Sequence, residues 1–139
     1  MPLVSVTRLR VRAWRFLPAF LVQAMRSNRQ ARRAQGNLGT SLLAEEHRTF
    51  WTLTAWADET AMRAFMVDGA HGRGMRKLKT WCDEAAVAHW TQSSSGLPSW
   101  DEAHQRLQAE GRRSKVRHPS AAHEEYRIPA PVVRKPRRG

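Results

Sequence analysis

The sequence contains one cysteine, Cys82, in 139 residues. It cannot form an internal disulfide, and such sparse cysteine is typical of proteins in a reducing compartment. No apolar run approaches the roughly 20 residues that a membrane-spanning helix needs. The richest stretch, FLPAFLVQAM at residues 16–25, is flanked by arginines. The N-terminus alternates polar and apolar residues and so lacks the core of a secretion signal. We expect a soluble, cytoplasmic protein without a membrane span.

Several signatures of known active sites are also absent. The sequence has no P-loop, no glycine-rich dinucleotide motif after a strand, no serine elbow and no paired carboxylates in a predicted cleft. Its histidines and single cysteine do not form the spacings of a zinc site, so we predict no metal site apart from haem iron. These absences argue against a nucleotide-dependent enzyme. They favour an enzyme that uses no cofactor or haem, if the protein is an enzyme.

Acidic residues are scarce relative to basic ones, and the net charge is +12. Residues 1–92 carry 14 Lys and Arg against 7 Asp and Glu, and residues 93–139 carry 10 against 5. A surface this positive attracts polyanions without reading their sequence. No helix-turn-helix, zinc-finger or RNA-recognition signature accompanies the charge, so we do not expect specific nucleic-acid binding.

What is present is a regular alternation of strand and helix patterns. Residues 3–11 alternate with period two and predict a strand, whereas residues 18–34 carry an apolar stripe of helical period. Residues 38–46 and 47–57 predict a β-hairpin, and Asp58 is placed to cap the next helix. A second short helix then precedes a last strand over residues 85–90.

The order strand, helix, strand, strand, helix, strand predicts a ferredoxin-like α+β sandwich. We expect a four-stranded antiparallel sheet with the helices on one face. Both sides of the strand near residues 50–56 carry aromatic bulk, so Trp51 or Trp56 would lie on the uncovered face. A second copy of the chain is the simplest way to bury it, which predicts a homodimer.

Composition divides the chain into three parts. Residues 1–92 form the predicted ferredoxin-like domain. Residues 93–111 comprise a linker, TQSSSGLPS, and a short helix over 100–111 capped by Ser99. Residues 112–139 hold four prolines, scattered basic residues and few aromatics, and are predicted to be a disordered basic tail.

The stretch FWTLTAWADETAMRAFMVDGAHGRGM resembles the third strand and second helix of the antibiotic biosynthesis monooxygenase-like proteins of the dimeric α+β barrel superfamily. The matching positions are a strand-ending tryptophan, an acidic helix start, a small-to-aromatic pair and a histidine: Trp56, Asp58, Glu59, Ala61, Phe65 and His71. The match is nearest to a subgroup described as similar to spheroidene monooxygenase, with CDEAAVAHW as its last strand. The resemblance covers residues 1–92 and implies a dimeric barrel. Members of the superfamily include cofactor-free oxygenases, haem-binding and haem-degrading enzymes, isomerases and decarboxylases.

One departure from the family pattern concerns haem. The haem-degrading relatives pair the helical histidine with an asparagine on the first strand, where this chain has Ser5 and Thr7. The resemblance therefore argues against haem degradation and leaves haem binding open.

His71 is the first candidate for a catalytic role. Its neighbours Gly69, Ala70, Gly72 and Gly74 are small and leave room for a ligand. As a general base or as an axial haem ligand, it would lie where the resemblance places the pocket. The alternative is a helix-terminal histidine that hydrogen-bonds to a backbone carbonyl.

The candidate substrate-binding residues are His89 and a set of aromatics: Trp51, Trp56, Phe65 and Trp90. Together the aromatics would form a flat apolar wall for an aromatic or polycyclic small molecule. His89, in the last strand, would point into the same pocket as His71. Each of these residues has an ordinary alternative as a core or interface side chain.

Arginines also alternate along the first predicted strand. Arg8, Arg10 and Arg12 would either hold an anionic substrate or form a solvated edge. Cys82 has no activating base nearby in the sequence, and we interpret it as structural.

Two functions follow. The first is a small homodimeric monooxygenase-like oxidoreductase in which His71 takes a proton from the substrate and the resulting anion reacts with oxygen. The second is a non-catalytic dimeric binding protein whose basic tail contacts polyanions.

Overall fold

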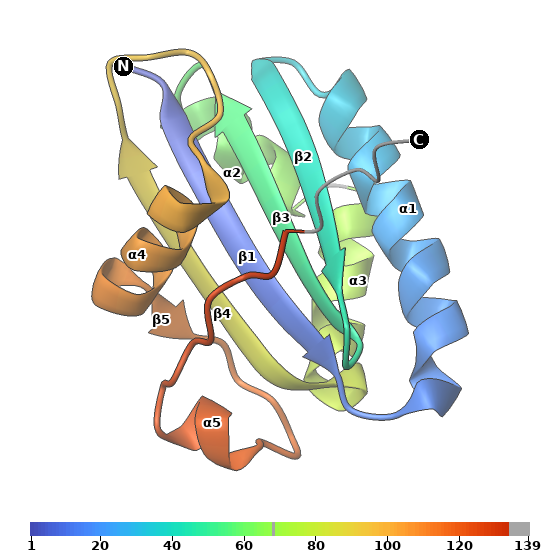
Figure 1. The fold of residues 1–139 in the computed structure, drawn as a ribbon. Helices are drawn as coiled ribbons and strands as arrows, with labels where there is room; N and C mark the ends of the chain where they lie inside the picture. The colour runs from blue at the N-terminus through green and yellow to red at the C-terminus, as the bar shows by residue number, and fades with distance from the viewer. Residues whose placement is uncertain (68, 134–139) are drawn as a thin grey trace, which may run out of the picture.

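A computed structural model describes residues 1–67 and 69–133, without the side chains of residues 69–73 and 75. The elements, in chain order, are β1 (Leu3–Val11), the 3-10 helix η1 (Trp14–Phe16), α1 (Leu17–Arg33), β2 (Asn37–Glu45), β3 (Thr49–Trp56), α2 (Glu59–Val67), α3 (Gly69–Trp81), β4 (Cys82–Thr91), α4 (Trp100–Glu110), β5 (Arg112–Arg113) and α5 (Ala121–Glu124) (Figure 1). The α+β class and the predicted element order are confirmed. None of the described helices is long and apolar enough to cross a membrane.

The strands form one antiparallel sheet in the order β2-β3-β1-β4-β5. The prediction of four strands is therefore wrong by one. The fifth, β5, is only two residues long and pairs with Ala86 and Val87 of β4. It forms because the chain returns along the outer edge of β4, whose backbone groups would otherwise be unpaired.

The helices of the predicted domain, α1, α2 and α3, cover one face of the sheet as expected, whereas α4, for which no face was predicted, crosses the other (Figure 1). Ser99 caps α4 as predicted, since its hydroxyl accepts a hydrogen bond from the Glu102 amide at 3.2 Å. The inward side chains Ala103 and Leu107 are four residues apart, so they share one side of the helix and are fully buried.

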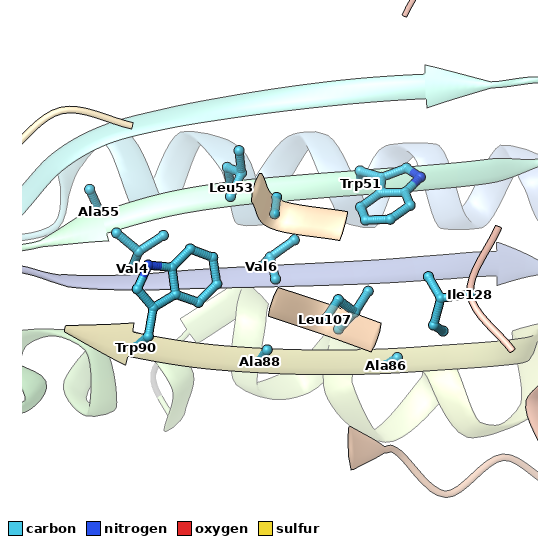
Figure 2. Packing of buried hydrophobic residues seen from close by; sticks show 11 residues of the cluster. Val4, Val6, Trp51, Leu53, Ala55, Ala86, Ala88, Trp90, Leu107 and Ile128 are labelled. Atoms are coloured by element: carbon cyan, nitrogen blue, oxygen red, sulfur yellow. The ribbon is translucent and has the colours of Figure 1, made fainter. Parts of the chain in front are cut away.

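A continuous apolar cluster lies between α4 and the sheet (Figure 2). We call it the α4-side core; its members are Val4, Val6, Trp51, Leu53, Ala55, Ala86, Ala88, Trp90, Ala103, Leu107 and Ile128. Trp51 is completely buried within this single chain. A second copy is thus not needed to cover Trp51, and the argument that led to a homodimer does not hold. The dimer itself stays a prediction.

Residues 112–133, expected as a disordered tail, form a strap across the same face of the sheet (Figure 1). The Tyr126 hydroxyl donates to the Leu107 carbonyl at 2.5 Å, and the Ile128 amide donates to the Gln108 side chain at 2.8 Å. Ile128 is only 8% exposed. One apolar anchor and a few hydrogen bonds to α4 hold a segment whose composition resembles that of a disordered tail.

The helix-covered face has two separate apolar clusters. One contains Trp56 stacked on Phe65, with ring centroids 5.1 Å apart, together with Leu3, Ala31 and Met62. The other surrounds Val11, Phe20 and Cys82 at the opposite end of the strands. Burial and, to a smaller extent, the charge of neighbouring Asp83 raise the pKa of the Cys82 thiol to about 12, so this cysteine is an inert core residue as predicted.

We predict that Leu107→Ala lowers the free energy of unfolding by about 3 kcal/mol, because it leaves a cavity between α4 and Trp51. Urea denaturation followed by tryptophan fluorescence measures the loss. Leu38→Ala is the matched control, since Leu38 is 45% exposed. Equal small effects from both substitutions would show that α4 does not seal this face.

Candidate functional site

A row of polar side chains runs across the middle of the helix-covered face. In the register of the sheet, Thr40 pairs with Thr54, Thr54 with Ser5, and Ser5 with His89. Paired residues lie opposite one another and point to the same face of a sheet. Four strands therefore each contribute one polar side chain to a single line, which we call the polar row.

The polar row separates the two apolar clusters on this face. Trp56 is two residues beyond Thr54 on its strand, and Leu3 is two residues before Ser5; both belong to the first cluster. On the other side of the row, Leu9 and Phe50 pack against the second cluster. Thr7 and Thr52 are paired beside the row and extend it. Buried polar groups cost free energy unless they are bonded, so a polar strip inside an apolar layer is a natural place for a ligand.

Two nitrogen atoms near this strip are buried without a hydrogen-bond partner among the described residues. They are Nε2 of His89 and Nε1 of Trp56. Unpartnered buried polar atoms are rare in folded proteins and usually have a functional explanation. Among the described residues, these two atoms are therefore the candidates for bonding to a ligand on this face.

The environment of His89 favours its neutral form. Burial is the largest influence that lowers the pKa of its imidazole, and the positive charges of Arg112 and Arg63 lower it further. Glu59 opposes them weakly. At neutral pH the ring is therefore uncharged, with one nitrogen able to accept a proton.

The structure brings some of the predicted site residues together and separates others. Trp56, Phe65 and His89 all belong to the helix-covered layer. Trp51 and Trp90 lie on the opposite face, in the α4-side core (Figure 2). A single pocket lined by all five residues is therefore wrong. The physical reason is strand parity, because Trp51 and Trp56 are five residues apart and His89 and Trp90 are adjacent.

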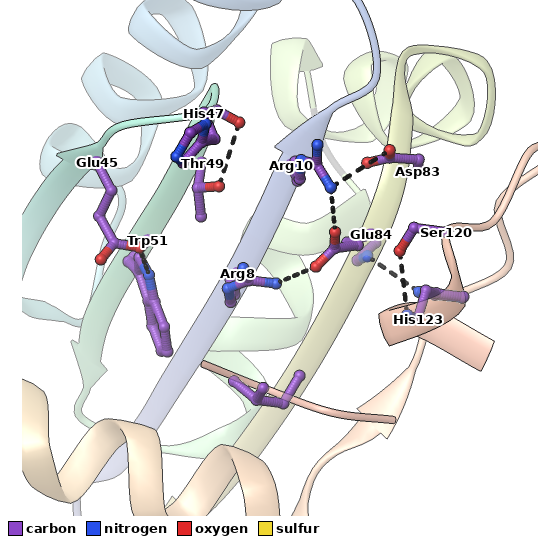
Figure 3. Close-up of polar contacts among 12 residues, drawn as sticks. Arg8, Arg10, Glu45, His47, Thr49, Trp51, Asp83, Glu84, Ser120 and His123 are labelled. Atoms are coloured by element: carbon purple, nitrogen blue, oxygen red, sulfur yellow. Dashed lines mark hydrogen bonds and ion pairs between the residues drawn. The ribbon is translucent and has the colours of Figure 1, made fainter. Parts of the chain in front are cut away.

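Trp51 has a structural role on its own face. Its indole Nε1 donates to Glu45 at 2.7 Å, and its ring meets Trp100 edge-on with centroids 6.4 Å apart (Figure 3). The other carboxylate oxygen of Glu45 accepts a hydrogen bond from the Val132 amide of the strap. Trp51 is thus enclosed by the chain on the α4 side of the sheet, away from the polar row.

His71 belongs to α3, but its side chain lies outside the described residues. Gly74, in the same helix, lies so close to the Gln23 side chain of α1 that a Cβ atom would clash with it. The close approach of α3 to α1 explains a glycine there. The role predicted for His71 stays a prediction.

The arginines of β1 do not form an anion site. Arg8 and Arg10 each donate to one oxygen of Glu84 at 2.8 Å, and Arg10 lies 3.8 Å from Asp83 (Figure 3). The side chains of Arg8 and Glu84 are 7% and 6% exposed. Sequence analysis missed Glu84, whose spacing of five from His89 places it on the other face, beneath the strap.

The electrostatics of this group follow from its burial. Burial alone would raise the pKa of Glu84, but hydrogen bonds from Arg10 and Arg8 outweigh it and hold the pKa below its usual value. Burial raises the pKa of Asp83, and Arg10 opposes that shift only partly. The strap lies beside the group, since His123 Nδ1 accepts a hydrogen bond from the Ala85 amide at 3.3 Å (Figure 3).

Comparison with known sequences identifies the family. Residues 16–116 match the family described as "Domain of unknown function (DUF3291)", and the chain belongs to this family. No curated protein matches the sequence significantly. The matched region extends from η1 through α4 and so includes the helix that covers the second face.

Solved structures show the same α+β fold at low sequence identity. SnoaB, a cofactor-independent oxygenase from Streptomyces nogalater, is 18% identical with a TM-score of 0.56, over 70% of this chain and 98% of that chain. An antibiotic biosynthesis monooxygenase is 12% identical with a TM-score of 0.59, over 66% and 99%. A conserved protein from Methanosarcina mazei Go1 is 12% identical with a TM-score of 0.59, over 67% and 94%. The fold is therefore that of the antibiotic biosynthesis monooxygenase-like proteins.

We predict that Glu84→Gln lowers the free energy of unfolding at pH 7 by about 3 kcal/mol, because it leaves buried Arg8 without a counter-charge and Arg10 with only Asp83. In the wild type, ionised Glu84 stabilises the fold fully at pH values above 4.5, the pKa of the carboxyl in the unfolded chain. This stabilisation is lost as the pH falls through the lower pKa of the folded state. The difference between variant and wild type should therefore shrink in acid.

Urea denaturation at pH 7 and at decreasing pH below 4.5 measures this difference. Glu110→Gln is the control, because Glu110 pairs with Arg106 at the surface and its side chain is 50% exposed. A difference that is constant with pH would contradict the assignment.

We also predict that His89 titrates below 6.5 in the folded protein. Since burial favours the neutral ring, the pKa should rise when the chain unfolds in urea. The imidazole resonances followed by NMR against pH measure both values. A folded-state pKa above the unfolded one would show that His89 is paired with an acid.

Proposed function

We propose that this protein is a small oxygenase-like enzyme that binds an aromatic or polycyclic molecule between the sheet and α2–α3 and oxidises it without a bound cofactor. The observation that carries the proposal is the polar row, with Nε2 of His89 and Nε1 of Trp56 unpartnered beside it. An apolar layer interrupted by a few polar atoms is the arrangement that binds and orients a flat, oxygen-bearing molecule.

The chain's own residues supply three roles. The stacked Trp56 and Phe65 rings offer an apolar wall. The Trp56 indole N–H donates a hydrogen bond to a substrate oxygen, which replaces the partner it lacks in the protein. Neutral His89 accepts a proton from an acidic C–H or O–H of the substrate.

Removal of that proton leaves an electron-rich anion, which is oxidised by molecular oxygen. One oxygen atom becomes a carbonyl oxygen of the product, and the other leaves as water. Its two hydrogens both come from the oxidised methylene carbon of an anthrone, or from the ring carbon and the hydroxyl of a naphthol. The substrate is thus both the electron donor and the acceptor of oxygen, so atoms and electrons balance without another reductant. SnoaB, which shares this fold, is a cofactor-independent oxygenase, and that supports the same class of reaction here.

His71 is the second proposed base. It lies on α3, and the resemblance of residues 50–75 to the monooxygenase-like proteins supports a role for it at the same pocket. Because His89 and His71 are on different elements, their contributions are separable by substitution.

Haem fits the described residues poorly. A haem needs an axial ligand and an apolar slot for its flat ring. His89 offers a nitrogen, but the sheet beside it carries the hydroxyls of Ser5, Thr54 and Thr7 rather than an apolar wall. We therefore propose a reaction without haem.

The proposed activity is tested with a panel of anthrones and naphthols, by oxygen uptake and product absorbance. We expect His89→Gln to lower kcat by about 100-fold or more, which is typical of the loss of a general base. Trp56→Phe, which keeps the ring and removes the donor, should mainly raise KM. His118→Gln is the control, since His118 is an exposed strap residue.

His71→Gln belongs in the same series. If His71 is the base, its substitution and not that of His89 removes turnover. No turnover of any panel member by the wild type, together with no saturable binding of these compounds, would contradict the function. Saturable binding without turnover would instead establish the non-catalytic binding protein.

An absorption spectrum tests the cofactor prediction independently. We expect no Soret shift when haem is added to the purified protein, for wild type and His71→Ala alike. A shifted Soret band in the wild type that disappears in His71→Ala would make this a haem protein with His71 as iron ligand.

A further inference from the structure

The outer side of α1 and the edge strand β2 form a second surface, on which arginines lie beside exposed apolar side chains. A groove between them is lined by Met25, Asn28, Arg29, Arg32, Arg33 and Leu42. The arginines are exposed, and none of the ion pairs among the described residues includes them. Leu42 pairs with Thr52 at the edge of the polar row, but none of the residues that line the groove has a part in the proposed reaction.

The charge of the groove is uncompensated by its surroundings. The first 44 residues contain eight arginines and no aspartate or glutamate. Arg29, Arg32 and Arg33 follow one another on the last two turns of α1, so they share its outer side. The field at this groove therefore favours an anionic partner and repels a second copy of the same surface.

The groove is also apolar. Met25 is 70% exposed and Leu42 is 50% exposed, and Val22, one turn before Met25, is 51% exposed. Phosphate backbones gain nothing from such side chains. A partner that carries both carboxylates and apolar side chains suits this surface better than a nucleic acid does.

The third feature is the free edge of the sheet. β2 pairs with β3 on one side only, and no other described strand lies beyond it. In addition, the Asn28 side-chain oxygen is buried in the groove without a donor among the described residues. An extended peptide satisfies both, because it presents backbone N–H and C=O groups along its whole length.

We propose that the α1–β2 groove binds an extended peptide that adds to the sheet beside β2 and turns both acidic and apolar side chains toward the groove. In that position, every second side chain of the peptide lies on the same face as Leu42 and faces the α1 arginines. Main-chain hydrogen bonds provide affinity, and the arginines and Leu42 provide selectivity. The partner is thus another protein with an acidic extended segment.

The test uses the full chain and a fluorescein-labelled synthetic peptide of about eight residues, in which the groove-facing positions carry glutamate and valine in turn and threonine stands between them. Fluorescence anisotropy should show saturable binding that weakens as salt is added. Arg29→Glu/Arg32→Glu should weaken it at least about tenfold. Arg26→Glu/Arg117→Glu is the matched control, because it makes the same change in net charge at exposed positions outside the groove.

A peptide with proline at alternate positions tests the geometry, since proline cannot donate to a strand ladder. Loss of binding by this peptide supports addition to β2. Equal binding of the proline peptide, equal weakening by the control variant, or no binding of the glutamate–valine peptide overturns the proposal. Phosphatidylserine vesicles and a single-stranded oligonucleotide complete the series. Binding of either one, but not of the peptide, in a manner sensitive to Arg29→Glu/Arg32→Glu also overturns it.

Discussion

The rest of this fold depends on one constraint: a single chain must cover both faces of its sheet. β1 lies between β3 and β4, and its side chains point alternately to the two faces. Val4 and Val6 are fully buried on the α4 side, and Val11 is fully buried on the other. Three helices cover one face, and α4 with the strap covers the other (Figure 1). The separation of core from candidate site follows from this division.

The two faces differ in how their apolar side chains are arranged. On the α4 side the apolar cluster is continuous, and the buried Arg8 and Glu84 beside it are paired with each other. On the helix-covered side the polar row divides the apolar packing into two clusters. Buried nitrogen atoms without a partner among the described residues occur on both faces, at Trp90 on the α4 side and at His89 and Trp56 on the other. The polar row is therefore the feature that led us to propose the site on the helix-covered face.

Much of the fold was predictable from the sequence, because period-two and helical patterns directly report which side of each element is buried. The element order, the Ser99 cap and the inert Cys82 follow from such local signals. The position of α4 does not, since a serine-rich linker leaves the direction of the next helix open. The strap was missed for a similar reason, as one buried residue, Ile128, anchors a segment of polar composition.

The candidate site was less predictable from the sequence than the fold was. His89, Trp56 and Phe65 were predicted to lie in one site, and they do share the helix-covered layer. Trp51 and Trp90 were predicted there too, although the alternation of side chains along each strand already places them on the opposite face. The polar row needed more than the sequence, because it depends on the register between four strands. The ion pairs of Glu84 could not be predicted, because its two arginine partners are more than seventy residues away in the sequence.

The strap also determines how this protein is made. Together with α4 it comes from the last residues described, so Trp51, Leu53 and Trp90 are synthesised well before the segments that cover them. While the ribosome completes the chain, the sheet presents an apolar surface with no cover, and such surfaces are where nascent proteins aggregate or recruit chaperones. Production of this protein in cells should therefore be more sensitive to premature termination near its C-terminus than its compact first ninety residues suggest.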